Sequence, residues 1–524
     1  MRPIQVGVGL VGGLVLLGGA KITYYEEALP ETLNPLFATS MAEYRTHELM
    51  FDRLFYRSPI QNKIKSKIVQ SYEPLEGNSV LNVWLKEGLK WQDGEPLTAA
   101  DVCFTVDVLL DAKNASTVAK PYAEAIKKCS VNTKENKATI TFHRSYFELR
   151  ERVAFHVLPK HKFKGTRVSQ NDGFSARPIG SGPLKGTKGP RAATLTAQRT
   201  SPHHKPNIDA VTVQPSGDAA IAKNTILSNG VQGIISVPPQ YRAEIEASDE
   251  LSLKSYDLRS WWFIALNTNR GALKNVLVRQ ALNLTLDRWN LRQYTVGYEK
   301  DDPYPACEFV SGPFVQTSTY YNNDVPVFER SDRGRAAELM KQAGAIQQNG
   351  KWIMDDKVVN LRIGMNAALA SEAADLISQV GNQLQEGGFD RTVEKISTDD
   401  WKRLVLSGQT GDYDLLIGDW SFGLNEDVSD IFHTRNNAKS KGSRNIFNYS
   451  NRQVDSLLAD YSTAETDTQA KDAYHALHSL LSEDLPYLFL WRLDTKSAWR
   501  NDVRDSTITP YYYFTTFDRW NYTE

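Results

Sequence analysis

Few side chains in this sequence have a type and spacing that could support catalysis or metal binding. His203 and His204 lie between two prolines, which indicates a loop, and adjacent side chains point apart on most backbones. Neighbouring carboxylates such as Asp399 and Asp400 are typical of solvated turns. The sequence has no GxSxG motif, Walker A loop, HExxH motif or kinase motif set. We therefore expect a protein that is not an enzyme and that contains no metal and no cofactor.

Four tryptophans are better placed to contact a ligand. Trp261, Trp262, Trp401 and Trp420 lie at the starts or ends of predicted strands and helices, where an α/β sheet opens its ligand crevice. Trp261 and Trp262 alternate on one strand, so only one of them can point toward a ligand. Packing in a core is the alternative interpretation of each tryptophan.

The three cysteines do not form a metal-binding or disulfide-scaffold pattern. Cys103, Cys129 and Cys307 lack both CxxC spacing and Cys/His metal spacing, and at most one disulfide bond can form among them. If one forms, Cys103 with Cys129 is the favoured pair because these two are close in sequence. Buried free thiols are the alternative.

Length, composition and charge describe a large globular protein. The 524 residues predict about three to five domain-sized units. The composition of 41% hydrophobic and 23% charged residues is ordinary for packed domains and excludes a disordered chain. The 61 Lys and Arg against 62 Asp and Glu leave a net charge of -1, so the basic field that nucleic acid requires is missing.

The first twenty residues have the pattern of a secretory signal peptide. Arg2 precedes the apolar, glycine-rich run 6–17, and Gly18 and Ala20 are small residues at the -3 and -1 positions of a cleavage site. We expect cleavage after residue 20; an uncleaved anchor is the alternative. No cysteine follows the run, which argues against a lipoprotein. The GxGxxG match inside the run lacks a preceding strand, so it does not indicate dinucleotide binding.

Strands and helices alternate along the remaining chain, which predicts an α/β protein. Thr98 and Asp101 form a capping-box pattern at the start of one helix. The stretch 162–205 is rich in Gly, Pro, Ser, Lys and Arg, so we expect loops there rather than a packed element. The predicted strands are 22–25, 80–86, 138–142, 210–214, 262–266, 361–365, 413–417 and 487–491, and further helices are predicted at 41–54, 219–228, 276–291, 372–384 and 470–481.

Five segments in this order resemble the family 5 extracellular solute-binding proteins, the receptors of ABC importers for oligopeptides, dipeptides, nickel and related solutes. They span nearly the whole mature chain, and the second is the most specific. The segments are PETLNPLFAT (30–39), EGLKWQDGEPLTAADVCFTVD (87–107), PIGSGPLK (178–185), FIALNTNRGALKNVLVRQALNLTLDR (263–288), and DYDLLIGDW (412–420) with PYLFLW (486–491).

The resemblance implies a periplasmic-binding-protein type II fold, with two lobes joined by strands that cross twice and an extra α/β subdomain. A solute that contacts both lobes stabilises the closed state, and a membrane permease reads that closure. By analogy, lobe I comprises 21–54, 180–262 and 489–524, the extra subdomain 55–179, and lobe II 263–488, after a signal peptide at 1–20.

The resemblance also implies which residues face the solute. From lobe I, we expect contacts by residues just after the first strand. From lobe II, we expect contacts by residues around the DYDLLIGDW strand. Trp261 and Trp262 are expected near the hinge. Arg279 and Asp287 match strong family positions but are interpreted as structural. The expected solute-binding residues are Thr39, Met41, Tyr44, Trp261, Trp262, Trp401, Trp420, Ser421, Phe422, Asn425 and Glu426.

The sequence departs from the dipeptide-binding members of the family at two ionic anchors. Gly423 stands where they have an aspartate for the ligand's ammonium, and Ala367 where they have an arginine for its carboxylate. A buried charged terminus without a counter-charge costs several kcal/mol, so a simple free dipeptide is disfavoured. Glu426 is the candidate replacement for the ammonium partner.

The combined expectation is a monomeric periplasmic receptor that delivers a peptide or peptide-like solute to an ABC permease. The first alternative keeps this fold but binds a metal chelate, haem, opine or sugar, for uptake or sensing. The second is a secreted hydrolase or transferase, which the missing motifs disfavour.

Overall fold

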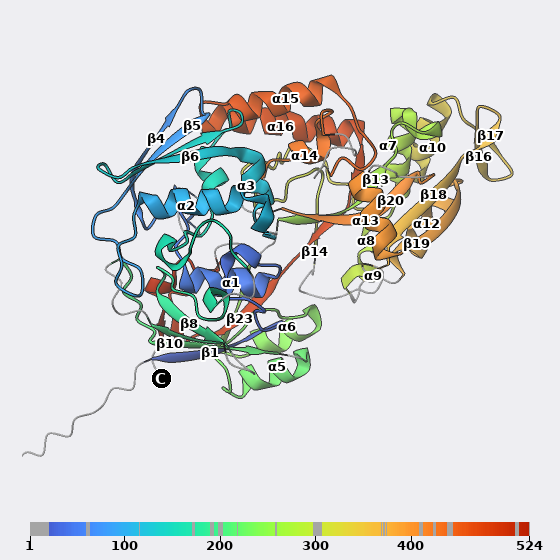
Figure 1. The fold of residues 1–524 in the computed structure, drawn as a ribbon. Coiled ribbons are helices and arrows are strands. Elements are labelled where there is room, and N and C mark those ends of the chain that lie inside the picture. Colours follow the sequence, from blue (N-terminus) through green and yellow to red (C-terminus); the bar gives the residue numbers. More distant parts are fainter. Residues whose placement is uncertain are drawn as a thin grey trace, which may run out of the picture.

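The protein is a mixed α/β molecule built on three principal sheets (Figure 1). The computed structural model describes residues 20–522 except 59–62, 115, 170–172, 189–192, 198–202, 217, 257–258, 297–306, 368, 370–372, 374, 408–411, 423–425, 437–443 and 509–512. The predicted signal peptide therefore lies outside the described residues, apart from Ala20. Within the described part, no helix has both the length and the apolar character needed to cross a membrane.

The largest sheet has seven strands drawn from widely separated stretches of the chain. Its order is β12 (Leu251–Ser255), β23 (Lys496–Arg500), β11 (Gly233–Ile234), β1 (Lys21–Glu26), β10 (Ala210–Pro215), β9 (Ala193–Ala197) and β8 (Leu184–Lys188). Helices α5 (Ala219–Leu227) and α6 (Pro239–Glu246) cover one face, and α1 (Met41–Met50) lies on the other (Figure 1). The parallel pairing of β1 with β10 joins Lys21 and the residues after it to residues almost 200 positions later.

A four-stranded antiparallel sheet forms a separate layer beside α1. Its order is β4 (Val69–Leu75), β5 (Val80–Leu85), β7 (Lys137–Phe142) and β6 (Ile126–Asn132), and α2 (Ala99–Leu110) packs across it. The capping box of Thr98 and Asp101 is present. Cys103 on α2 and Cys129 on β6 form a disulfide, as the favoured pairing predicted, and Cys307 is a buried free cysteine.

The third sheet has five strands in the order β19 (Asp390–Ile396), β18 (Asn360–Asn366), β20 (Leu415–Ser421), β13 (Ser260–Leu266) and β21 (Tyr487–Phe489). Helices around it and above it complete this half of the molecule (Figure 1). They are α7 (Val276–Thr285), α10 (Arg333–Gln342), α12 (Leu376–Glu386), α13 (Thr398–Ser407), α14 (Ser429–Phe432), α15 (Arg452–Thr463) and α16 (Asp467–Asp484).

The remaining elements are short, and β15, β16 and β17 form a small sheet of their own. The strands are β2 (Tyr56–Arg57), β3 (Ile64–Lys65), β14 (Cys307–Phe309), β15 (Ile346–Gln348), β16 (Lys351–Met354), β17 (Lys357–Val358), β22 (Trp491–Leu493), β24 (Val503–Arg504) and β25 (Asn521–Tyr522). The helices are α3 (Lys120–Ala125), α4 (Gly173–Ala176), α8 (Arg288–Leu291) and α9 (Gln293–Val296).

The chain passes between the seven-stranded and five-stranded sheets twice, after β12 and before β23. The two crossing segments are bonded to each other: the N–H of Tyr256 donates to the carbonyl of Thr495 at 3.1 Å, and the Thr495 hydroxyl donates to the carbonyl of Tyr256 at 2.9 Å. Buried Arg242 binds Asp494 beside them. This double connection is the feature expected of a type II binding-protein fold.

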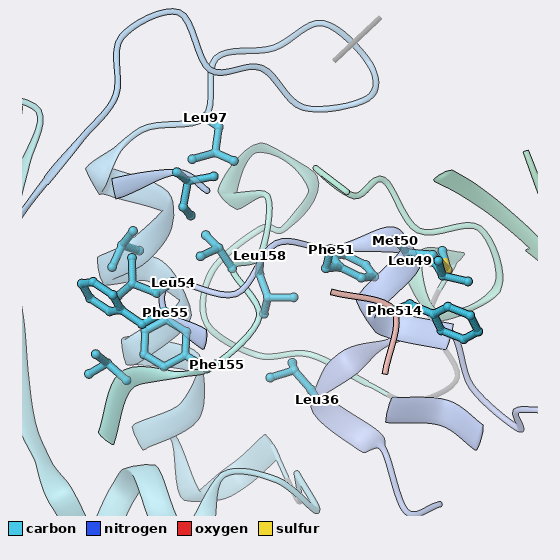
Figure 2. Close-up of a cluster of buried hydrophobic side chains, with 14 of the residues drawn as sticks. Leu36, Leu49, Met50, Phe51, Leu54, Phe55, Leu97, Phe155, Leu158 and Phe514 are labelled. Atoms are coloured by element: carbon cyan, nitrogen blue, oxygen red, sulfur yellow. The ribbon is translucent and has the colours of Figure 1, made fainter. Parts of the chain in front are cut away.

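The C-terminal segment closes the core around α1. Figure 2 shows Phe514 beside Leu49 and Met50, with Phe51, Leu54 and Phe155 continuing the buried cluster. The helix ends at Met50, where the N–H of Gly182 donates to the Met50 carbonyl at 2.9 Å. A Cβ on Gly180 would lie 1.8 Å from that carbonyl oxygen, so the glycines of the PIGSGP segment permit this close approach.

Several expectations about the elements are wrong in detail. The stretch 162–205 is not only loops, because β8 and β9 extend the seven-stranded sheet as an antiparallel pair. The helix expected over 276–291 breaks after Thr285, since the Asp287 carboxylate caps α8 by accepting from the N–H of Asn290. The strand expected over 487–491 divides into β21 and β22.

The expectation that His203 and His204 point apart is also wrong. The Nε2 atom of His203 lies 2.8 Å from one oxygen of the Asp52 carboxylate, and the Nε2 atom of His204 lies 2.9 Å from the other. The two side chains therefore converge on one buried acid from a loop that precedes β10.

We expect removal of the disulfide to destabilise the four-stranded layer. Cross-linking positions separated by 26 residues restricts the unfolded chain by an amount worth about 3 kcal/mol. Replacing both Cys103 and Cys129 with serine should therefore lower the midpoint of thermal unfolding, measured by circular dichroism, and a thiol reductant should lower the midpoint of the unmodified protein similarly. Reductant should have no further effect on the double variant. Three free thiols in the unreduced, denatured protein would contradict this bond.

Candidate functional site

A shallow pocket, about 220 Å³ in volume with open solvent included, lies where β13 begins and where the chain leaves β20. Its wall is mostly apolar, with one acidic and one basic side chain among aromatic and aliphatic groups. The lining residues are Arg259, Trp261, Pro313, Phe314, Val315, Phe422, Glu426 and Val428. Concave apolar sites with a few polar groups are typical of small-molecule binding, and this one adjoins the crossing after β12.

The two adjacent tryptophans of β13 belong to opposite faces of the sheet. Trp261 lines the pocket, stacks on Phe422 at a centroid distance of 6.0 Å, and donates its indole N–H to the carbonyl of Pro313 at 2.9 Å. Trp262 is buried in the core on the other face, among the residues that pack against α7 and α12. The alternation of a strand thus places only Trp261 in the pocket.

The charges inside the pocket compensate each other. The Arg259 guanidinium lies 2.9 Å from one Glu426 oxygen, and the Ser318 hydroxyl donates to the other at 2.7 Å. A carboxylate that binds an arginine is already neutralised, so Glu426 is a weaker partner for a ligand ammonium than an unpaired acid would be. The arrangement offers aromatic and aliphatic contact area and a hydrogen-bonding pair.

Arg444 organises the stretch that follows β20. Its guanidinium lies over the rings of Trp420 and Phe422, 5.2 and 4.8 Å from their centroids, and binds Asp430. It also donates to the carbonyl of Ser421 at 3.2 Å. Trp420 stacks on Phe263 rather than lining the pocket.

The next acidic residue along this stretch ties it to a distant part of the chain. Asp427 lies 2.9 Å from Arg152 and 3.8 Å from Arg144, which both belong to the segment after β7. Burial disfavours the Asp427 anion, but Arg152, Ser429 and Arg144 outweigh this effect and lower the pKa of the carboxyl to about 2. Phe147 packs edge-on against Tyr461 of α15 in the same region. The pocket-forming stretch is therefore anchored by residues from outside the five-stranded half.

The remaining residues expected at the site lie elsewhere. Thr39 and Met41 flank the start of α1, and Tyr44 is on its first turns; none of the three lines the pocket. The Thr39 hydroxyl donates to Glu43 at 3.1 Å, as part of the network that caps the helix. Burial raises the pKa of Tyr44. Trp401 of α13 is half-buried against the core that includes Trp261.

Two of the remaining expected positions cannot be placed, and two lie at the ends of strands. Asn425 and the anchor position Gly423 lie outside the described residues. Ser421 is exposed at the end of β20, and the anchor position Ala367 is exposed just after β18. Arg279 is buried, binds Asp484 at 2.5 Å and donates to backbone carbonyls, which is a structural arrangement.

Sequence reasoning missed the residues that complete the pocket from other segments. Pro313, Phe314 and Val315 come from a loop after β14, and no periodic pattern relates them to β13 or β20. Arg259 carried a weak signal, as an isolated charge directly before an aromatic strand. Only the tertiary fold brings these groups to Glu426.

The family follows from comparison with known proteins. The family model for bacterial extracellular solute-binding proteins, family 5 Middle, matches residues 63–442. The chain belongs to this family of solute-binding proteins, as the five sequence segments predicted.

This chain aligns with known relatives and with solved structures along nearly its whole length. The oligopeptide-binding protein AppA of Bacillus subtilis (strain 168) is 24% identical over 505 residues, which cover 94% of this chain and 89% of AppA. The nickel-binding protein NikA of Staphylococcus aureus (strain NCTC 8325 / PS 47) is 22% identical over 485 residues, 91% of this chain and 90% of NikA. The structure of Bacillus subtilis AppA in complex with a nonapeptide matches with a TM-score of 0.72 and 22% identity, covering 97% of this chain and 99% of that chain. This likeness shows that the fold is shared.

We expect the Arg152–Asp427 ion pair to stabilise the protein measurably. Both side chains are largely buried, so their coupling should be about 1 kcal/mol or more in a double-mutant cycle of Arg152→Met and Asp427→Asn, read by urea unfolding. The exposed pair of Asp400 and Arg403 is the control, and its cycle should give a coupling near zero.

The coupling should also depend on pH in a defined direction. Because the folded-state pKa of Asp427 lies below the ordinary aspartate pKa of 3.8, the contribution of the ion pair to stability is fully present above about pH 4 and is lost as the pH falls toward 2. Equal coupling for the two pairs would contradict the anchoring of this stretch by Arg152.

Proposed function

We propose that this protein is the receptor of an ABC importer and captures a peptide or peptide-like solute between two lobes. The solute stabilises the closed arrangement, and the closed receptor delivers it to a membrane permease. The observation that carries the proposal is the end-to-end match of the fold to the AppA structure that holds a nonapeptide. Membership of the solute-binding family supports it.

The proposed lobes follow the sequence division. Lobe I comprises 21–54, 180–262 and 489–524, the subdomain 55–179, and lobe II 263–488. The paired crossing segments around Tyr256 and Thr495 support a hinge, because bending there moves the two larger sheets without breaking either of them.

The proposed solute site combines the pocket with residues around it. Trp261, Phe422 and Glu426 line the pocket, and Trp420 and Ser421 lie beside it. Thr39, Met41 and Tyr44 would meet the solute from lobe I, and Trp401 and Asn425 from lobe II. Trp262 takes no part in this proposal, since it packs on the opposite face of β13.

The proposed location is outside the inner membrane, in the periplasm, after cleavage of the signal peptide. The Cys103–Cys129 disulfide supports this location, because such bonds persist in oxidising compartments and are rare in the cytosol. The protein acts as a monomer and performs no catalysis, since lobe closure alone generates the signal.

A second candidate keeps the fold and changes the solute to a non-peptide, such as a metal chelate, haem, an opine or a sugar. Two observations favour it: a relative is named as a nickel-binding protein, and the pocket acid Glu426 is already paired with Arg259. Neither anchor position of the dipeptide-binding relatives carries a charged residue in this chain.

Native mass spectrometry of the mature protein purified from the periplasm distinguishes these candidates. We expect a family of added masses that resolve into peptides after denaturation, because main-chain recognition accepts varied side chains. A single non-peptide mass would replace the main proposal by the second candidate. If the protein is purified without a bound solute, a thermal-shift screen of peptides and chelates makes the same distinction, and stabilisation by chelates alone would reject the peptide proposal.

We expect Trp420→Ala to weaken binding of the solute at least tenfold without unfolding the protein, since aromatic contact area dominates many binding sites. Isothermal titration calorimetry with the released solute measures the loss. Trp84→Ala is the matched control, because Trp84 is a half-buried tryptophan on the four-stranded sheet and should leave affinity unchanged. Unchanged affinity in Trp420→Ala would remove this residue from the site.

A further inference from the structure

Three potential metal ligands from two distant segments meet away from the solute pocket. Asp52 follows α1, and His203 and His204 precede β10. One carboxylate oxygen of Asp52 faces each histidine Nε2, at 2.8 and 2.9 Å, and the ligand atoms all lie within 4.8 Å of one another. Asp52 and His204 are buried and His203 is nearly so.

A second layer of contacts orients the buried histidine. The Nδ1 atom of His204 lies 2.7 Å from the carboxylate of Asp518 near the C-terminus, and Lys67 binds the same carboxylate at 2.9 Å. Histidines that bind metals almost always donate their other ring N–H to a carboxylate or carbonyl, which fixes the tautomer that exposes Nε2. His204 has this arrangement, with Nε2 directed at Asp52.

The charged side chains that bind the two histidines, and their ion-pair partner Lys67, carry more negative than positive charge. Asp52 and Asp518 contribute two negative charges, and Lys67 contributes one positive charge. A buried excess of negative charge is costly unless a cation compensates it. A divalent ion between Asp52 and the two Nε2 atoms would supply that compensation.

The cluster opens onto a second pocket, which provides a route for an ion. This pocket has a volume of about 300 Å³, open solvent included, and is lined by Glu48, Phe51, Asp52, Arg53, Tyr56, Lys67 and Thr515. Its wall also contains the buried carboxylate of Glu48. The Oε1 atom of Glu48 accepts no hydrogen bond from the described residues, and the Nε atom of Arg53 lies 3.7 Å from it. A second carboxylate oxygen is thus available beside the cluster.

We propose that Asp52, His203 and His204 form a binding site for a divalent transition-metal ion, with Asp518 as the positioning residue of His204. Two imidazoles and a carboxylate suit Zn²⁺ and its neighbours in the first transition series rather than Ca²⁺ or Mg²⁺, which prefer oxygen ligands.

The observed spacing brackets what such an ion requires. Tetrahedral zinc at about 2.0–2.1 Å from each ligand atom separates those atoms by about 3.3 Å. The Asp52–histidine separations of 2.8 and 2.9 Å need to widen by a few tenths of an ångström, and any separation toward the 4.8 Å limit of the cluster needs to narrow. The ion would fasten the end of α1 and the loop before β10 to the C-terminal segment.

The test uses the full mature chain without a polyhistidine tag, stripped of metal with EDTA. Cobalt(II) is the optical probe, because tetrahedral coordination gives strong visible absorption that octahedral aqueous cobalt lacks. We expect one equivalent of Co²⁺ to develop this absorption, Zn²⁺ to abolish it by displacement, and Zn²⁺ to raise the midpoint of thermal unfolding.

Variants assign the ligands. His203→Gln should lower the affinity for Zn²⁺ by roughly 10- to 100-fold or more, and Zn²⁺ should no longer raise the midpoint of thermal unfolding. Asp518→Asn should lower the affinity for Zn²⁺ by roughly 10- to 100-fold, and its Co²⁺ complex should keep the tetrahedral spectrum. His161→Gln is the matched control, because His161 also binds a carboxylate, that of Asp93 at 2.8 Å, but outside the cluster.

Two results would overturn the proposal. One is a wild-type protein that develops no tetrahedral cobalt spectrum, a measurement that does not depend on whether any variant folds. The other is an unchanged zinc affinity in His203→Gln. Neither result bears on the solute, since the cluster shares no residue with the pocket at Trp261.

Discussion

The rest of the structure depends on the pairing of the two segments that cross between the large sheets. Tyr256 and Thr495 form two hydrogen bonds with each other, and the buried Arg242 forms an ion pair with Asp494. Only a few residues separate this pairing from Arg259, which lines the pocket. A solute that rearranges the contacts of Arg259 therefore acts directly on the segment about which the two halves of the molecule would move.

Much of the fold could be predicted because its signals are local. The capping box at Thr98, the alternation of β5 and β7, and the spacing of Cys103 and Cys129 each depend on residues close in sequence. The predictions that were wrong concern elements whose form depends on interactions that local patterns do not reveal. β8 and β9 have compositions typical of loops and become strands because β10 offers a free edge. The break before Asp287 is a capping interaction that apolar periodicity does not reveal.

Three of the residues that line the pocket, Trp261, Phe422 and Glu426, were expected from the resemblance to the family. The alternation of side chains along a strand added that only one of Trp261 and Trp262 can face the pocket. Arg259 as the partner of Glu426, and Arg152 as the partner of Asp427, come from segments whose distance along the chain hides their proximity. The same holds for the histidines on Asp52: a loop composition correctly indicated irregular backbone, but it gave no information about which buried acid the side chains reach.

If the pocket holds the solute, as we propose, the pairing of Glu426 with Arg259 limits which solutes it can select. A ligand ammonium that replaced Arg259 would leave a guanidinium to be solvated elsewhere, which is costly unless the ligand also supplies an acceptor for the arginine. A zwitterionic or polyamide segment does supply both. Under the proposed function, the pocket would therefore favour a solute that offers a donor and an acceptor together, whether a peptide backbone or a zwitterionic non-peptide group, over an isolated charged terminus.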